Sequence, residues 1–118
     1  MTNWPQLTTG LNALLRDLRG GAPAIMKAFA GIAQAATASN ALDAKTKELI
    51  ALGIAVAVRC DDCIAFHAKA AVEHGATKDE VSETLGKAIY MGAGPSVMYA
   101  RHAFEAFTQF EASKRTVP

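Results

Sequence analysis

The sequence predicts an all-α fold of about six helices. Alanine, leucine, lysine and glutamate, which favour helices, recur at helical spacing along the 118 residues. No alternating run of β-branched residues bounded by hairpin turns occurs in it. The chain has no second-domain linker and no internal repeat, and its length is sufficient for one hydrophobic core. Residues 1–118 are therefore predicted to form a single domain.

Two amphipathic stretches predict the first two helices. The first helix is expected from about Leu7 to Arg19, because its leucines share one face, and the Gly20-Gly21 pair supplies conformations that end a helix. The second is expected from about Pro23 to Ala38, because proline in the first turn lacks only an N–H that has no helical partner there. Residues 39–42 form the loop that follows.

The third and fourth predicted helices flank the cysteines. Asp43 is expected to cap a helix that runs to about Val58, since its carboxylate can accept bonds from free backbone N–H groups. Residues 49–58 are wholly apolar apart from the backbone and are expected to be buried on nearly all sides. The cysteine segment forms the fourth helix, to about His74, and Gly75 is expected to cap it.

The last two predicted helices are separated by a glycine- and proline-rich break. Residues 77–80, Thr-Lys-Asp-Glu, have the pattern of a capping box and predict the start of the fifth helix. Residues 92–95 are expected to break it, and a sixth helix is expected from Ser96 to about Ser113. The tail, residues 114–118, is expected to fray.

Composition limits the classes of partner. Charged residues make up only 19% of the chain against roughly 25% in typical globular domains, which suggests contacts between subunits. Twelve basic and eleven acidic residues are interspersed, so neither a nucleic-acid partner nor a membrane partner is expected. The first residues do not resemble a signal peptide, which predicts a cytoplasmic protein. A stable structural disulfide is rare in that compartment, so a cysteine pair there indicates catalysis or metal binding.

The two cysteines and a histidine form a CxxCxxxH motif at Cys60, Cys63 and His67. On a helix these side chains share one stripe, and Cys63 and His67 are neighbours at i and i+4. The thiolate is the reactive form of cysteine, and a CxxC at a helix N-terminus has a lowered thiol pKa. The negative charges of Asp61 and Asp62 oppose thiolate formation, so their side chains are expected to point to solvent or to cap N–H groups.

Glu48 is the acidic residue that we add to this cluster. It lies in an apolar stretch, and a buried carboxylate requires a partner. A continuous helix would separate Glu48 from Cys60 by about 18 Å, so the chain must turn near residues 58–60. Such a turn would let His67 carry a proton between Glu48 and a cysteine.

Three other interpretations of these residues stay open. The cysteines could be small apolar core residues, and His67 could have a structural role. A zinc site would need all four side chains of a C-x2-C-x3-H-x6-H pattern that ends at His74, but the pattern fits no common site, so neither a metal nor a cofactor is expected. Glu48 could instead form a salt bridge with a nearby cation. The candidates are Lys45, Lys47 and Arg59.

Several motifs together resemble the alkylhydroperoxidase AhpD-like, or carboxymuconolactone decarboxylase-like, proteins over about residues 43–110. They are the segment 47–52, the twelve-residue step from Glu48 to Cys60, the CxxCxxxH motif, and the segments 74–77 and 88–95. The resemblance implies an AhpD-like helical bundle that assembles into homotrimers or homohexamers. It also implies thiol-dependent reduction of hydroperoxides in antioxidant defence, with an unidentified thiol or dithiol as reductant.

Carried over to this chain, the resemblance makes Cys60 and Cys63 the redox pair and makes His67 and Glu48 the proton relay. In the family the second cysteine attacks the peroxide, whereas the helix dipole favours Cys60 as the more acidic thiol. The lipoyl-dependent AhpD enzymes carry a histidine between the cysteines, where this chain has Asp61-Asp62. A non-catalytic redox switch or scaffold is the alternative, and a lactone decarboxylase, which lacks the cysteine pair, is a more distant one.

Overall fold

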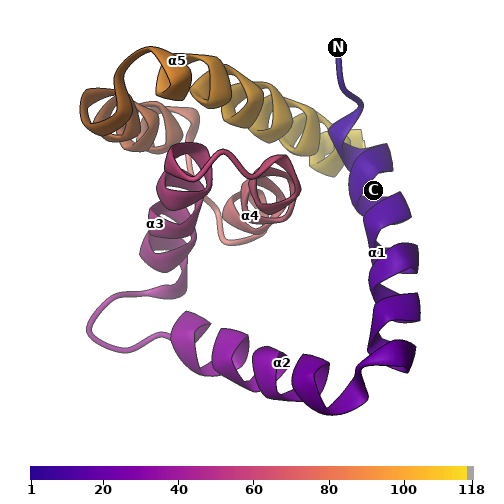
Figure 1. Cartoon of the computed structure of the whole chain (residues 1–118). Coiled ribbons are helices and arrows are strands. Elements are labelled where there is room, and N and C mark those ends of the chain that lie inside the picture. The colour runs from indigo at the N-terminus through magenta and orange to yellow at the C-terminus, as the bar shows by residue number, and fades with distance from the viewer. Residues whose placement is uncertain (117–118) are drawn as a thin grey trace.

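The computed structural model describes residues 1–116, which form five α-helices and no strand (Figure 1). In chain order they are α1 (Trp4–Gly21), α2 (Pro23–Thr37), α3 (Ala44–Ala57), α4 (Asp61–Glu73) and α5 (Lys78–Thr116). The all-α prediction is confirmed. The predicted count of six becomes five because the last two helices are joined in α5, across a kink at Ala93, where the backbone is non-helical (φ 54°, ψ −140°).

The core lies between α3, α4 and both halves of α5. Lys78, at the start of α5, has its Nζ 3.9 Å from a carboxylate oxygen of Glu111, near the end of the same helix, so the two halves run back against each other. The largest fully buried side chains here include Leu52, Ile64 and Phe107. The remaining core positions are mostly alanine, which lets the helices approach closely. The buried alanines are Ala55, Ala65, Ala68, Ala71, Ala76, Ala88, Ala100, Ala103 and Ala106.

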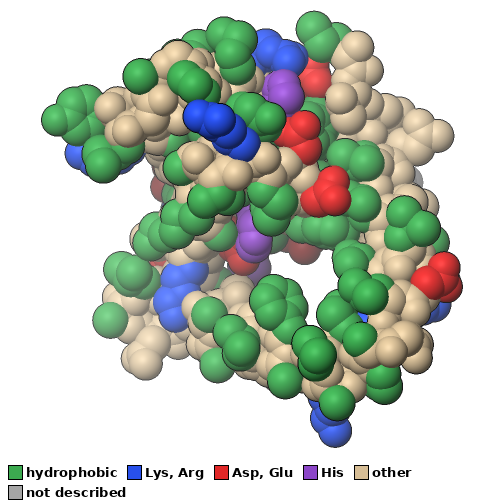
Figure 2. Space-filling view, in the orientation of Figure 1, with side chains coloured by type: hydrophobic (Ala, Val, Ile, Leu, Met, Phe, Trp, Pro, Cys, Tyr) green, Lys and Arg blue, Asp and Glu red, His purple; other side chains and the backbone are tan. Residues whose placement is uncertain are grey.

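Helices α1 and α2 form an arm that leaves this core. The first turn of α1 is anchored by Trp4, whose side chain is 1% exposed and donates Nε1–H to Glu105 (2.8 Å). Helix α2 has no buried residue. Figure 2 shows an open space between this arm and the block of α3 and α4, with hydrophobic side chains along its border. The large exposed apolar side chains of the arm are Leu14, Leu18, Ile25, Phe29 and Ile32.

The turn between α3 and α4 is the one that the sequence required. Arg59 N–H donates to Val56 O (3.2 Å) and Cys60 N–H donates to Ala55 O (3.0 Å), which is the Schellman pattern of a helix end. Arg59 has φ 60° in this turn, a left-handed conformation more usual for glycine. At the end of α4 the same pattern recurs with Gly75 at φ 80°, which confirms that predicted cap.

Several other predicted helix ends are also confirmed, but Gly20 and Gly21 do not cap the first helix: both are helical, and Ala22 is the C-cap of α1. Asp43 caps α3 by accepting from Thr46 N–H (2.8 Å), and Thr77 and Glu80 form a reciprocal capping box. α1 begins one turn earlier than predicted because the Asn3 side chain caps it by accepting from Gln6 N–H (3.0 Å).

Two expectations about exposure and order are wrong. Residues 49–58 are not buried on nearly all sides, because Ile50, Ile54 and Val58 lie on a face of α3 that no other helix of the chain covers. Within the predicted frayed tail, residues 114–116 continue α5, and Lys114 Nζ donates to Val72 O (3.3 Å). Residues 117–118 lie outside the described part. Among the residues described, no helix is both long and apolar enough to span a membrane.

Candidate functional site

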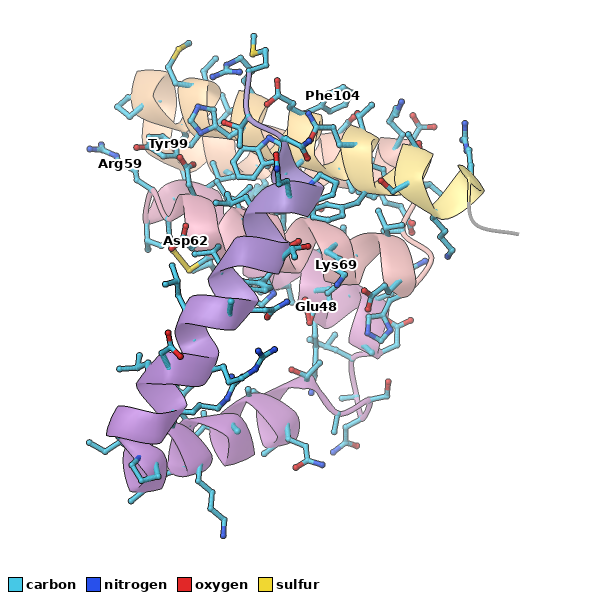
Figure 3. All side chains as sticks on the ribbon, turned by 90° about the vertical axis from the view of Figure 1, so that its right-hand side faces the viewer. Glu48, Arg59, Asp62, Lys69, Tyr99 and Phe104 are labelled. Atoms are coloured by element: carbon cyan, nitrogen blue, oxygen red, sulfur yellow. A yellow bond between two sulfur atoms is a disulfide. The ribbon has the colours of Figure 1, made fainter. Side chains whose placement is uncertain are left out.

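Cys60 and Cys63 form a disulfide at the N-terminus of α4. Cys60 is the N-cap residue, and Cys63 N–H donates to Cys60 Sγ (3.2 Å). Both residues are partly exposed, and Figure 3 shows the disulfide beside Asp62. The sulfur atoms therefore lie where the helix dipole and free N–H groups favour negative charge, as thiolate chemistry requires.

Glu48 and His67 form a carboxylate–imidazole pair between α3 and α4. His67 Nδ1–H donates to Glu48 Oε2 at 2.8 Å. The Glu48 side chain is 7% exposed and that of His67 is 38% exposed, so the carboxylate is covered and the imidazole reaches the surface. The Schellman turn at Arg59 makes this contact possible because it folds α4 back along α3.

Two of the three alternative partners of Glu48 bind elsewhere, and the third, Arg59, is exposed. Lys45 Nζ lies 2.8 Å from Glu80 Oε2, and Lys47 Nζ donates to Ala38 O (2.7 Å). The Lys45–Glu80 ion pair joins the first turns of α3 and α5, and it lowers the pKa of Glu80 while it raises the pKa of Lys45. It also fixes the segment of α3 that carries Glu48.

The pair has a clear chemical capacity. An ionised carboxylate only accepts hydrogen bonds, so Nδ1 of His67 carries the proton in this contact. The Nε2 atom of a neutral imidazole is then a free base. Cys63 lies one helical turn before His67 on the same face. The structure thus pairs Glu48 with His67, one helical turn after Cys63, and the joint action of these residues with the cysteines stays a prediction.

A second carboxylate–imidazole pair was missed from the sequence. Asp61, between the cysteines, is predicted to face solvent or to cap N–H groups, and no histidine is predicted to contact it. Instead, His102 Nδ1–H donates to Asp61 Oδ1 at 2.7 Å, across the contact between α4 and α5. One feature of the sequence hints at this position of His102: it precedes Ala106 by four residues. Ala106 is buried, so His102 lies at the edge of the core-facing side of its helix.

The remaining candidate ligands do not join this cluster. His74 is the exposed C-cap residue of α4. Within residues 1–116, no three histidine, cysteine, aspartate or glutamate side chains are placed to hold a metal ion.

The profile of the Carboxymuconolactone decarboxylase family matches residues 23–106. The chain belongs to this family. The resemblance drawn from the sequence motifs is thereby confirmed, and the matched region contains both cysteines and both carboxylate–imidazole pairs.

Known members and relatives of the carboxymuconolactone decarboxylase family cover nearly the whole chain. An uncharacterized protein of Cupriavidus necator is 42% identical over 104 residues, covering 88% of this chain and 92% of that protein. The apo crystal structure of a family member from Legionella pneumophila is 48% identical with a TM-score of 0.89, covering 92% and 96% of the two chains. A Thermotoga maritima family member is 27% identical with a TM-score of 0.82 and covers 92% of each chain. Its description raises involvement in an antioxidative response as a possibility.

Proposed function

We propose that this protein is a thiol-dependent hydroperoxide reductase that acts in antioxidant defence in the cytoplasm. The observation that carries the proposal is the Cys60–Cys63 disulfide at a helix N-terminus, one helical turn from the His67–Glu48 pair. A disulfide that closes at this position is the product expected of a two-cysteine peroxidase cycle. The antioxidative response raised in the description of the Thermotoga family member agrees with the proposed role in antioxidant defence.

The cycle has three balanced steps. A thiolate attacks the O–O bond of the hydroperoxide, forms a sulfenic acid and releases an alkoxide, which takes one proton to become the alcohol. The second thiol attacks the sulfenic sulfur, so the disulfide forms and water leaves. An external thiol or dithiol then supplies two electrons and two protons and restores both thiols. No cofactor or metal enters this scheme.

His67 and Glu48 move the protons in this proposal. The Nε2 atom of His67 takes the proton from the Cys63 thiol and later gives it to the alkoxide oxygen. Glu48 holds the imidazole by its 2.8 Å bond and stabilises the imidazolium that forms. Because His67 is the member of the pair that reaches the surface, it is also the one that an entering substrate can meet.

We assign the peroxide-attacking role to Cys63 and the resolving role to Cys60. Cys63 shares its helix face with His67, which is its neighbour at i+4. Cys60 is the N-cap residue and lies one turn farther from the base. The helix dipole acts on both sulfur atoms, so proximity to the base decides the assignment.

The test is hydroperoxide consumption with dithiothreitol as reductant. We expect both Cys60→Ser and Cys63→Ser to lose turnover, and Glu48→Gln to lower it by about 10²-fold, as for loss of a group that supports acid–base catalysis. A dione that traps sulfenic acid should label Cys60→Ser after one equivalent of peroxide but leave Cys63→Ser unlabelled.

Two outcomes would count against this function. Equal slow consumption by the parent protein and all three variants would remove the peroxidase and leave a redox switch or a scaffold. Turnover of a lactone that survives both cysteine substitutions would favour acid–base chemistry by Glu48 and His67 instead. Labelling of Cys63→Ser in place of Cys60→Ser would reverse the roles of the two cysteines.

A further inference from the structure

The Asp61–His102 pair lies next to the redox cysteines but has no part in the proton relay. Asp61 is the first residue of α4 and immediately follows Cys60. Its carboxylate belongs to the residue next to Cys60, and a negative charge close to a thiolate destabilises it. The 2.7 Å hydrogen bond with His102 is therefore the contact that can offset the charge of the Asp61 carboxylate.

The His102 ring is held from three helices. Besides the bond to Asp61 of α4, its ring centroid lies 5.0 Å from that of Tyr99, on α5, and 6.0 Å from that of Trp4, at the start of α1. Trp4 is itself fixed, because its backbone N–H donates to Gln109 Oε1 (2.8 Å) and its indole N–H donates to Glu105. The imidazole is therefore directed at Asp61 by the packing around it, with 24% of its side chain exposed.

The other charged residues close to Asp61 or His102 in the sequence either face each other or are exposed. Arg101 and Glu105, on either side of His102 along α5, are 3.9 Å apart and face each other. Asp62 is exposed, and Arg59 is exposed in the turn before Cys60. Trp4, the contact from α1, is uncharged. His102 is thus the hydrogen-bond donor that meets the Asp61 carboxylate directly.

We propose that His102 is a positioning residue that holds the Asp61 carboxylate and offsets its charge, and thereby makes the Cys60–Cys63 disulfide easier to reduce. The inference rests on the proposed redox use of this pair. Reduction transfers two electrons and two protons from a dithiol to the disulfide, which breaks the S–S bond and closes the disulfide of the reductant. A thiolate in the reduced form gains from any reduction of nearby negative charge, whereas the neutral disulfide does not.

The test is the equilibrium between the full-length protein and dithiothreitol, in which reduced and oxidised protein are counted by thiol alkylation. We expect His102→Asn to lower the equilibrium constant for reduction about three- to tenfold, since an unscreened carboxylate then faces the thiols. For a two-electron couple a tenfold change equals about 30 mV. His102→Gln keeps an N–H donor but loses the ring that Trp4 and Tyr99 hold toward Asp61, so it should shift the constant in the same direction.

A double-substitution cycle separates this role from a purely structural one. Adding Asp61→Asn to His102→Asn should restore the constant, because the charge that needed screening is gone. Asp62→Asn is the matched control, since Asp62 also lies between the cysteines but has no bond to His102. Its effect should simply add to that of His102→Asn.

The inference is overturned if the two His102 variants leave the constant unchanged, or if Asp61→Asn adds to His102→Asn no differently from Asp62→Asn. Circular dichroism checks the fold of each variant. If His102→Asn does not fold, His102→Gln takes its place in the test. The measurement needs no peroxide, so it distinguishes failure of this inference from failure of the peroxidase proposal.

Discussion

At the scale of single residues, Glu48 combines a proposed role in proton transfer with a cost in stability. Its side chain is 7% exposed, and His67 is the partner that it contacts in the described part of the chain. A buried carboxylate that loses its hydrogen-bond donor keeps the cost of desolvation without the compensating bond. The imidazole is therefore expected to matter to folding as well as to the proposed proton transfer.

This argument predicts how the pair responds to substitution. His67→Ala should lower the free energy of unfolding by about 1–3 kcal/mol, because it strands the Glu48 carboxylate. Glu48→Gln added to His67→Ala should recover part of that loss, since the amide is cheaper to bury than a charge. Urea denaturation measures both values. Additive losses in the double variant would contradict the coupling.

The residues of the site differ in how far sequence could predict them. Glu48, His67 and the cysteines could be placed together because a polar residue in an apolar helix, a fixed i+4 spacing and a forced turn all act within one stretch of chain. The Asp61–His102 contact could not be predicted in this way, because it joins residues that are 41 positions apart in the sequence. Its existence depends on how the second half of α5 is rotated after the kink at Ala93, and nothing in a single sequence specifies that rotation.

At the scale of helices and turns, the two Schellman ends give a comparison of glycine with another residue in the same conformation. Gly75 has φ 80° and Arg59 has φ 60°, and each is the residue just past a helix C-cap. An L side chain in this region costs about 1–2 kcal/mol. The α3–α4 turn therefore bears a strain that the α4–α5 turn avoids.

We expect Gly75→Ala to lower the free energy of unfolding by about 1–2 kcal/mol, since a Cβ there meets no atom within 4 Å and only the backbone conformation is penalised. Gly86→Ala is the control. Gly86 also has open space around a Cβ but lies inside α5, so alanine should stabilise the protein by about 0.5–1 kcal/mol. Chemical denaturation of both variants measures the two changes in the free energy of unfolding, which should have opposite signs. Changes of the same sign would contradict the role given to the left-handed backbone at Gly75.

The Lys45–Glu80 pair predicts a pH dependence at the same scale. The pKa of Glu80 is lowered from 4.5, first by its bond to Lys45 and then by the Thr77 N–H of the capping box. The folded chain therefore binds fewer protons than the unfolded chain in this range. The stability that Glu80 contributes is present above pH 4.5 and is lost as the pH falls through the lower, folded-state pKa.

Thermal unfolding checks this sign. The parent protein should have a higher Tm than Glu80→Gln at pH 7, and the difference should shrink as the pH falls well below 4.5. Glu83→Gln, on an exposed position of the same helix, should change Tm little at either pH. If the Tm difference between the parent protein and Glu80→Gln stays unchanged in acid, the charge of Glu80 does not cause it.

At the element scale, local chemistry again decided what sequence could predict. Caps such as Asp43 and the Thr77–Glu80 box are formed by residues three apart, so they follow from the sequence pattern. The exposure of Ile50 and Ile54 does not, because it depends on which side of α3 the other helices leave uncovered. An apolar face looks the same in sequence whether it meets its own chain or another.

At the scale of the whole molecule, the uncovered apolar side chains of α2 favour assembly. Ile25, Phe29 and Ile32 are 62–73% exposed and lie within one face of the helix. Together with the exposed apolar face of α3, they form uncovered apolar surface of the kind that marks protein–protein contacts. We propose that α2 contacts other copies of the chain in the homotrimer or homohexamer that the family resemblance implies.

Light scattering with α2 variants tests this assembly. Phe29→Glu should reduce the mass in solution from an oligomer toward one chain, because it places a charge in an apolar contact. Gln34→Glu makes the same change of charge on the opposite side of the helix and should leave the mass unchanged. A monomeric parent protein, or equal effects of the two variants, would contradict the proposal.

Helix α2 spans 15 residues without burying one side chain against its own chain. A helix of that length is only marginally stable in water, and local opening is cheap where few contacts must break. Its amide hydrogens should therefore exchange with solvent far faster than those of α3 and α4 in dilute protein, and slow down as the concentration rises. How much of this chain is folded at a given moment would then depend on how many copies surround it.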